Sequence, residues 1–207
     1  VAATEKGDYD YSKANYMDPT CIIMGAEDKG VSYEHLALCD EWIKIPMCGK
    51  IESLNVSVAA GVLIYEAVKQ EFLYRGAYLI NKKDEKKMIE LPFIDPKRGT
   101  AHPLIVGQSA AKIAELAGFT IPTHSKILLC ERTQFDWEDP FSREKLSPIL
   151  SMYKAKNFEI ATDMAYELVS KGGAGHSSAL YTDERKTERI HYYAKKMPSC
   201  RILVNSP

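Results

Sequence analysis

The sequence predicts an α/β protein with mainly parallel sheets and flanking helices, and three observations support this fold class. Short apolar runs such as residues 21–24 and 126–130 are typical of buried strands. Segments with helical spacing of apolar residues, such as 158–170, alternate with those runs. Several segments carry start and stop signals, including the glycine that ends the amphipathic stretch 108–118. This order of elements along the chain is the pattern of α/β domains.

The first third of the chain is expected to hold two strands and two helices. Residues 1–18 are polar and show no clean period, so they are expected to be irregular. The expected elements that follow, in chain order, are a strand at 21–24 that ends at Gly25, a helix at 33–41 with Ser32 as N-cap, a strand at 42–46 ended by its proline, and one long helix capped by Ser53 and broken near Arg75 and Gly76.

The remainder repeats the alternation. A polar helix at 81–90 leads into a surface loop at 92–107, which is punctuated by Pro and Gly. The later elements are expected as a helix at 108–118, strands at 126–130 and 148–153 around a polar loop at 136–143, a helix at 158–170, a strand at 178–182, a helix at 183–196 and a strand at 201–205. The helix at 183–196 has Asp at its start and Lys at its end, as the helix dipole favours.

Length and charge set the limits of the domain organisation. The 207 residues, 45% of them hydrophobic, suffice for one large domain or two small ones. With 27 Lys and Arg against 28 Asp and Glu, no global imbalance indicates nucleic-acid or membrane binding. The charge is uneven, because residues 1–70 hold six basic and eleven acidic residues, which supports a boundary near residue 70.

The cysteines and the hydropathy indicate a cytoplasmic protein without a membrane segment. The five cysteines, an odd number, form neither a CxxC pair nor a spacing typical of metal ligands. No apolar run approaches the roughly 18 residues that a membrane-spanning helix needs. The start of the chain also lacks the pattern of a signal peptide.

Two segments of the first part suggest a ligand site. The loop MGAEDKGV at 24–31 leaves a strand, and its glycines let the backbone approach a ligand closely. Residues 45–47, IPM, are followed by SLNVSVAAG at 53–61, whose small residues permit tight backbone packing. Each segment also has a purely structural interpretation, as a glycine turn and as a capped helix with a small-residue packing face.

Together, GAEDKG, IPM and ESLNVSVAAGVLIYEAV resemble two signature motifs of the SpoU-type (TrmH-like) RNA ribose 2'-O-methyltransferases. The resemblance implies the knotted half of that fold, a homodimer, and an rRNA or tRNA substrate. It implies that Ser53 and Asn55 lie closest to the catalytic centre. The residues it implies for binding S-adenosylmethionine, mostly through backbone groups, are Gly25, Glu27, Gly30, Ile45, Met47, Leu54 and Asn55. The family's first motif, which carries the arginine thought to help deprotonate the ribose hydroxyl, is absent.

The second part contains four segments that look generic singly, namely IVGQS at 105–109, KILL at 126–129, PFSREKLSP at 140–148 and GHSSALYT at 175–182. Glu144 is either a solvated loop residue or an acceptor for the two hydroxyls of a ribose. His176 is either a loop-packing residue or an acid/base group.

At these spacings the four segments resemble the CoA-acylating aldehyde dehydrogenase part of bifunctional acetaldehyde/alcohol dehydrogenases, from about residue 65 to 207. The resemblance implies part of the catalytic domain, with NAD and coenzyme A as cofactors, and a contact between Glu144 and the nicotinamide ribose of NAD. The family's nucleophilic cysteine has no counterpart here, because SLNVSVAAG occupies its place. Without a thiolate, no acyl-enzyme is expected.

The two resemblances meet within one helix, because residues 64–70 fit both families. We therefore expect two partial domains, 1–68 and 69–207. The favoured interpretation is an S-adenosylmethionine-binding part of an RNA methyltransferase fused to an incomplete dehydrogenase segment. The alternatives are a fragment of an NAD-dependent, CoA-acylating aldehyde dehydrogenase without its cysteine, and a non-catalytic α/β scaffold.

Overall fold

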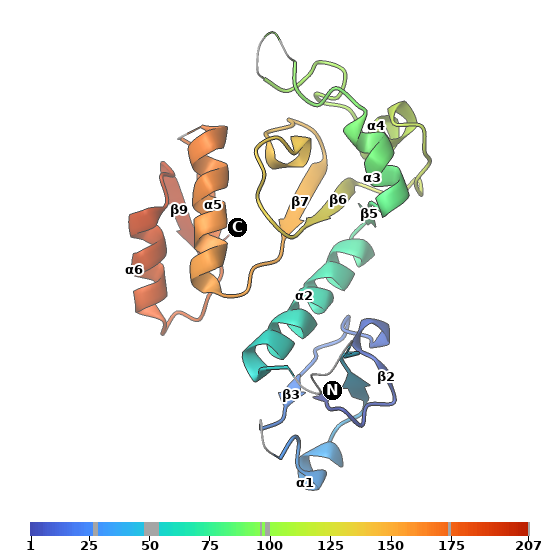
Figure 1. Cartoon of the computed structure of the whole chain (residues 1–207), viewed down its shortest axis with the longest axis vertical. Coiled ribbons are helices and arrows are strands. Elements are labelled where there is room, and N and C mark those ends of the chain that lie inside the picture. The colour runs from blue at the N-terminus through green and yellow to red at the C-terminus, as the bar shows by residue number, and fades with distance from the viewer. Residues whose placement is uncertain (27–28, 48–53, 96, 98–99, 174, 207) are drawn as a thin grey trace. The chain divides into compact units, whose positions relative to one another are not determined.

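The computed structural model of the chain describes residues 1–26, 29–47, 54–95, 97, 100–173 and 175–206. It divides into two compact units, Val1–Arg75 and Gly76–Pro207. Both units contain parallel strands with flanking helices, which confirms the predicted fold class (Figure 1).

The first unit is built on a parallel sheet in the order β2-β4-β1-β3. Its strands are β1 (Ala2–Ala3), β2 (Tyr9–Asp10), β3 (Ile23–Met24) and β4 (Trp42–Lys44). The expectation that residues 1–18 are irregular was therefore wrong, since two segments of this stretch pair with β4. Unlike β3, which lies in the continuous apolar run 21–24, these two strands lie in a polar stretch that shows neither an apolar run nor an alternation.

Two helices of the first unit begin at side-chain caps. Helix α1 (Tyr33–Leu36) follows Ser32, whose side chain accepts from the His35 amide, as predicted. It ends before the expected residue 41, and the Trp42 indole N–H donates to the Leu36 carbonyl at 3.0 Å. Helix α2 (Val56–Tyr74) is capped by Asn55 rather than by the expected Ser53, which lies outside the described residues. The predicted domain boundary at residue 68 lies inside α2.

The core of the first unit forms where α2 meets the sheet. Leu63 of α2 is fully buried and belongs to one apolar cluster with Ile43 of β4, Ala14 and Tyr16. The Gln70 side chain accepts from the Tyr16 amide at 3.3 Å and donates to the Ala14 carbonyl at 3.1 Å. These bonds fix the segment after the 3₁₀ turn η1 (Tyr11–Lys13) against α2.

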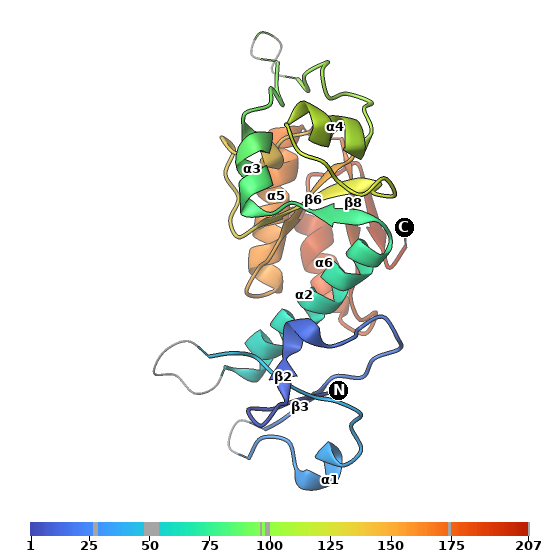
Figure 2. The same ribbon diagram turned by 90° about the vertical axis from the view of Figure 1, so that its right-hand side faces the viewer.

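The second unit is built on the parallel sheet β5-β6-β7, comprising β5 (Ala77–Leu79), β6 (Ile127–Arg132) and β7 (Ile149–Tyr153). Helices α3 (Lys82–Ile89) and α4 (Ala110–Leu116) lie beside β5 and β6 (Figure 2). The sequence did not reveal β5, which begins directly after Gly76 has turned the chain at a φ of +98°. Met88, Phe93, Ile113 and Leu128 are buried together in the core.

The last part of the second unit pairs two strands in parallel. Its elements are α5 (Phe158–Gly172), β8 (Ser177–Leu180), α6 (Thr187–Lys196) and β9 (Arg201–Val204). Helix α6 begins four residues later than expected, because Asp183 accepts from the Arg185 amide in a turn that precedes the helix. Among the described residues, no helix is both long and apolar enough to cross a membrane.

Candidate functional site

The first unit contains a cavity of about 890 Å³. Its walls come from the chain that leaves β1, β3 and β4 and from the start of α2. The carboxyl ends of parallel strands meet at one edge of a sheet, which is where α/β proteins bind their ligands. The volume lies in the range of small-molecule and cofactor sites.

The cavity brings together most of the residues predicted for S-adenosylmethionine. The predicted residues that line it are Gly25, Gly30, Ile45, Met47, Leu54 and Asn55. Glu27 and Ser53, the two other predicted site residues of this unit, lie outside the described residues. Three segments far apart in the sequence thus meet around one space.

The glycines of this loop are required by the backbone itself. Ala26 and Gly30 bond to each other through both amides, with N···O distances of 2.8 and 3.1 Å. A Cβ atom on Gly25 would lie 2.3 Å from the Gly30 carbonyl carbon, and Gly30 has a φ of +64°. Gly25 and Gly30 are therefore needed for the turn itself, and they also line the cavity.

Three of the six described polar residues that line the cavity are lysines. Lys6, Lys29 and Lys44 line it and are exposed, with Glu5 as the carboxylate that lines it beside them. Lys6 donates to the Tyr33 hydroxyl at 3.2 Å. The described lining residues include no arginine. Asn55 caps α2 by accepting from the Ser57 amide at 3.0 Å.

Glu144 lies in the second unit, on the loop between the 3₁₀ turn η2 (Pro140–Ser142) and β7, and its side chain is exposed. The loop is anchored by the next residue, Lys145, which is 9% exposed. The Lys145 ammonium donates to the carbonyls of Phe141 at 2.8 Å and Arg143 at 2.7 Å. The sequence interpretation missed this anchor, although a lysine beside a proposed ligand contact was a signal for it.

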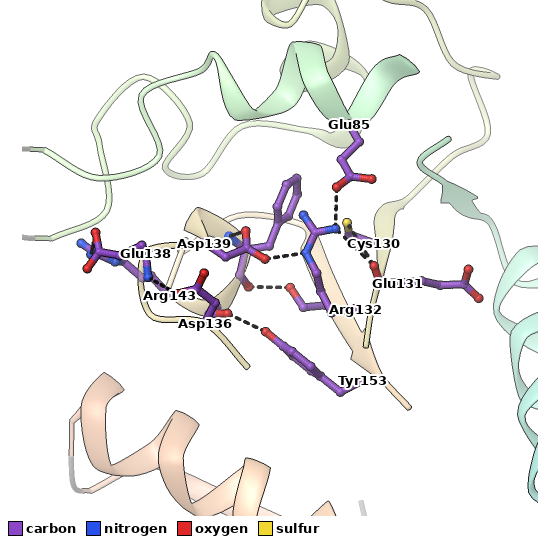
Figure 3. A network of polar contacts seen from close by, with 12 residues as sticks. Glu85, Cys130, Glu131, Arg132, Asp136, Glu138, Asp139, Arg143 and Tyr153 are labelled. Atoms are coloured by element: carbon purple, nitrogen blue, oxygen red, sulfur yellow. Dashed lines mark hydrogen bonds and ion pairs between the residues drawn. The ribbon is translucent and has the colours of Figure 1, made fainter. Parts of the chain in front are cut away.

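Arg132 is the centre of a network of ion pairs and ring contacts that includes residues of the segment just before this loop (Figure 3). The guanidinium of Arg132, at the end of β6, pairs with Glu85 of α3 at 2.7 Å and with Asp139 at 2.6 Å. It also lies over the Phe141 ring, 4.3 Å from the centroid. A shallow cavity of about 450 Å³ borders Arg132, Glu85 and Asp139. Periodicity reveals no such network, because its members come from three separate segments.

None of the described cysteines lies in segment 53–61, where the resemblance places the nucleophilic cysteine. Cys130 is buried in β6, and burial raises the pKa of its thiol to about 12, so it remains protonated near neutral pH. The thiol of Cys200 donates to the Gly175 carbonyl at 2.8 Å. Cys21 and Cys39 belong to the first unit, and Cys48 lies outside the described residues. The part of the chain that the structure describes also holds no metal-binding cluster of His, Cys, Asp or Glu.

Comparison with known proteins gives two matches for one chain. The SpoU rRNA methylase family model matches residues 1–65. The bifunctional aldehyde-alcohol dehydrogenase AdhE of Escherichia coli is 44% identical over 160 residues, which are 77% of this chain and 18% of that protein. The aldehyde-alcohol dehydrogenase of Clostridium acetobutylicum is 45% identical over a stretch of the same length and coverage. The chain thus spans about a fifth of the length of these relatives.

Solved structures agree with the second match. An acetylating aldehyde dehydrogenase from Geobacillus thermoglucosidasius superposes with a TM-score of 0.58 and 34% identity, covering 71% of this chain and 30% of that one. A probable aldehyde dehydrogenase from Listeria monocytogenes gives the same TM-score and identity. The 65 and 160 matched residues together exceed the chain's 207, so the two similarities overlap. The predicted resemblance of one chain to two families is confirmed.

Proposed function

We propose that residues 76–207 supply part of the catalytic domain of an acylating aldehyde dehydrogenase, with Glu144 contacting the nicotinamide ribose of NAD. The observation that carries the proposal is the 44% identity over 160 residues to a bifunctional aldehyde-alcohol dehydrogenase. The exposed carboxylate of Glu144 supports it, because a carboxylate accepts hydrogen bonds from both hydroxyls of a ribose. In the complete enzyme, NAD would accept the hydride and coenzyme A would accept the acyl group.

The chain alone is not expected to oxidise aldehydes. Covalent catalysis of this kind needs a thiolate, and the thiol of Cys130 stays protonated inside the sheet. Glu144 is also the one NAD contact that the resemblance assigns to this chain, and a single exposed carboxylate is too little to hold a dinucleotide. The segment therefore contributes a ribose contact and a scaffold, and the nucleophile has to come from another source.

A hybrid enzyme tests this proposal. Residues 76–207 replace the matching segment of the Escherichia coli aldehyde-alcohol dehydrogenase, and NADH formation is followed with acetaldehyde and coenzyme A. We expect the hybrid to be active. Glu144→Gln in the hybrid should raise the KM for NAD by roughly tenfold, because a charge-assisted hydrogen bond is lost. Glu159→Gln, at an exposed position in the first turn of α5, is the matched control. A folded but inactive hybrid would contradict the proposal.

A second candidate function is binding of S-adenosylmethionine by the first unit, and the cavity of about 890 Å³ is the observation that favours it. Six residues that the SpoU resemblance implies for this cofactor line the cavity. Methyl transfer to rRNA or tRNA, a homodimer and a knotted backbone are further implications of the resemblance and stay predictions. Transfer would in addition need an arginine from outside the described cavity wall.

A charge placed in the cavity tests this second candidate. Leu54→Arg puts a long cation into the cavity wall, so binding of S-adenosylmethionine in equilibrium dialysis should fall at least tenfold. Val58→Arg, on an exposed position of α2 that does not line the cavity, is the matched control and should leave binding unchanged. Equal binding by both variants would exclude the cavity as the site. No binding by the folded, unsubstituted chain would favour the scaffold interpretation for this unit.

A further inference from the structure

We propose that Lys145 is a positioning residue that holds the Glu144 loop in the conformation in which Glu144 meets the nicotinamide ribose. The inference rests on the dehydrogenase function proposed above. It concerns a buried side chain that acts through the backbone on either side of Glu144.

The geometry of the loop carries the inference. The Lys145 ammonium reaches back to the Arg143 carbonyl at 2.7 Å and to the Phe141 carbonyl at 2.8 Å. The bond to Arg143 closes a ring that contains the backbone of Glu144. Because the Lys145 side chain that closes this ring is buried, the backbone of Glu144 is held in place while the Glu144 side chain remains exposed.

Neighbouring bonds show which part of the loop depends on Lys145. The Phe141 carbonyl has a second donor, the Ser151 hydroxyl of β7 at 2.5 Å. On the other side, Leu146 takes a φ of +47°, and its carbonyl accepts from the Gly107 amide at 3.1 Å. Among the described hydrogen bonds, Lys145 is the donor to the Arg143 carbonyl. Losing the ammonium therefore frees the backbone immediately before Glu144.

The electrostatics indicate that Lys145 is not there for stability. Its ammonium bonds to carbonyls rather than to a carboxylate, and burial lowers its pKa to about 8 against the smaller opposing influence of Asp139 and Cys130. Arg132 lowers the pKa further. A buried cation of this kind disfavours the folded state, and an apolar side chain of similar volume is often neutral or stabilising in its place. We therefore assign the Lys145 ammonium the role of holding the Glu144 loop.

The first test uses the full chain and needs no ligand. Lys145→Met keeps the volume and removes the donors, so the free energy of unfolding should stay unchanged or rise. Amide hydrogen exchange at Gly107, whose N–H reports on Leu146, and at Arg143 should become at least tenfold faster. Ile80, whose N–H donates to the Leu129 carbonyl inside the sheet, is the control amide and should not respond. Unchanged exchange at Gly107 and Arg143 would overturn the proposal.

The second test uses the hybrid enzyme. Lys145→Met should lower kcat/KM for NAD at least tenfold, mainly through KM and without loss of stability, and Lys145→Arg should restore part of it by supplying donors again. A purely structural role predicts instead that stability falls and that KM for NAD does not move selectively. An active hybrid with an unchanged KM for NAD in Lys145→Met would overturn this inference alone. An inactive unsubstituted hybrid would overturn the dehydrogenase proposal and the role of Lys145 with it.

Discussion

The two units differ in the length of their strands and in where their proposed ligand contacts lie. The first unit has strands of two or three residues, and the chain segments that leave them enclose about 890 Å³. The second unit has strands of up to six residues and a larger apolar core, and its proposed ligand contact, Glu144, lies on an exposed loop. The longer sequence similarity spans 160 residues, more than the 132 residues of the second unit, so it reaches into the first unit as well. Sequence identity over a whole domain reflects a shared fold, whereas a ligand-binding site depends on a few residues in loops.

The largest expected effect is a loss of stability in the second unit when the Arg132 network is broken. Arg132→Met should lower the free energy of unfolding by about 3 kcal/mol, because it strands two partly buried carboxylates, Glu85 and Asp139. Arg185→Met, which removes an ion pair to Asp183 at the surface, is the control and should cause no measurable change. Urea unfolding monitored on both variants measures the difference, and equal midpoints would show that the network does not stabilise this unit.

A smaller effect is expected from a glycine in the first unit. A Cβ on Gly7 would lie 2.3 Å from the Ile43 carbonyl carbon, so Gly7→Ala should destabilise the sheet by about 2 kcal/mol. Gly61→Ala in α2 meets nothing within 4 Å and should stabilise by about 0.5 kcal/mol, since alanine favours the helix. Thermal unfolding with a probe in the first unit measures both. A harmless Gly7→Ala would mean that the short strands are not packed as described.

The buried thiol of the second unit predicts a pH dependence. Burial raises the pKa of Cys130 to about 12, so its contribution to stability is complete below pH 9 and is lost as the pH rises toward 12. Cys130→Ala removes this titration. The difference in unfolding free energy between the unsubstituted chain and Cys130→Ala should therefore shrink by about 1 kcal/mol between pH 9 and pH 10. A constant difference over this range would show that the thiol is not shielded from water.

The smallest effect concerns the cap of α2. Asn55→Ala should cost about 1 kcal/mol, because the Ser57 amide loses its acceptor, while Asn55→Asp keeps the cap and should be nearly neutral. Both substitutions also alter the proposed cofactor contact at Asn55. If Asn55→Asp retains stability yet loses S-adenosylmethionine in dialysis, the cavity role is separate from the capping role. Unchanged cofactor binding in Asn55→Ala would contradict the proposed contact.

The sequence predicted the fold class and the longer elements, and its failures have identifiable physical causes. Strands β6 and β7 and helix α5 show clear apolar patterns, and they occur close to their expected positions. Strands β1 and β2 lie in a polar stretch without an apolar run, and the apolar residues of β5 directly continue the helical segment before Gly76, so pairing with neighbours decides their conformation. The cap of α2 was missed for another reason: Ser and Asn cap helices equally well, and Asn55 caps α2, while Ser53 lies outside the described residues.

The candidate sites were predictable where a motif carried them and not where distant residues meet. Gly25, Ile45 and Leu54 were identified from family motifs, and the fold then placed them around one cavity. The anchor Lys145 and the Arg132 network depend on buried side chains and on three segments that only the folded chain brings together. Such groups leave no periodic signal in a single sequence.

The most direct test of the two-part account is calorimetric titration of the full chain with S-adenosylmethionine and, separately, with NAD. We expect saturable binding of S-adenosylmethionine, one molecule per chain, because the first unit contains a cavity of about 890 Å³. We expect no measurable heat from NAD, because Glu144 is the single ribose contact proposed for the second unit. Saturable binding of NAD together with silence from S-adenosylmethionine would contradict the account.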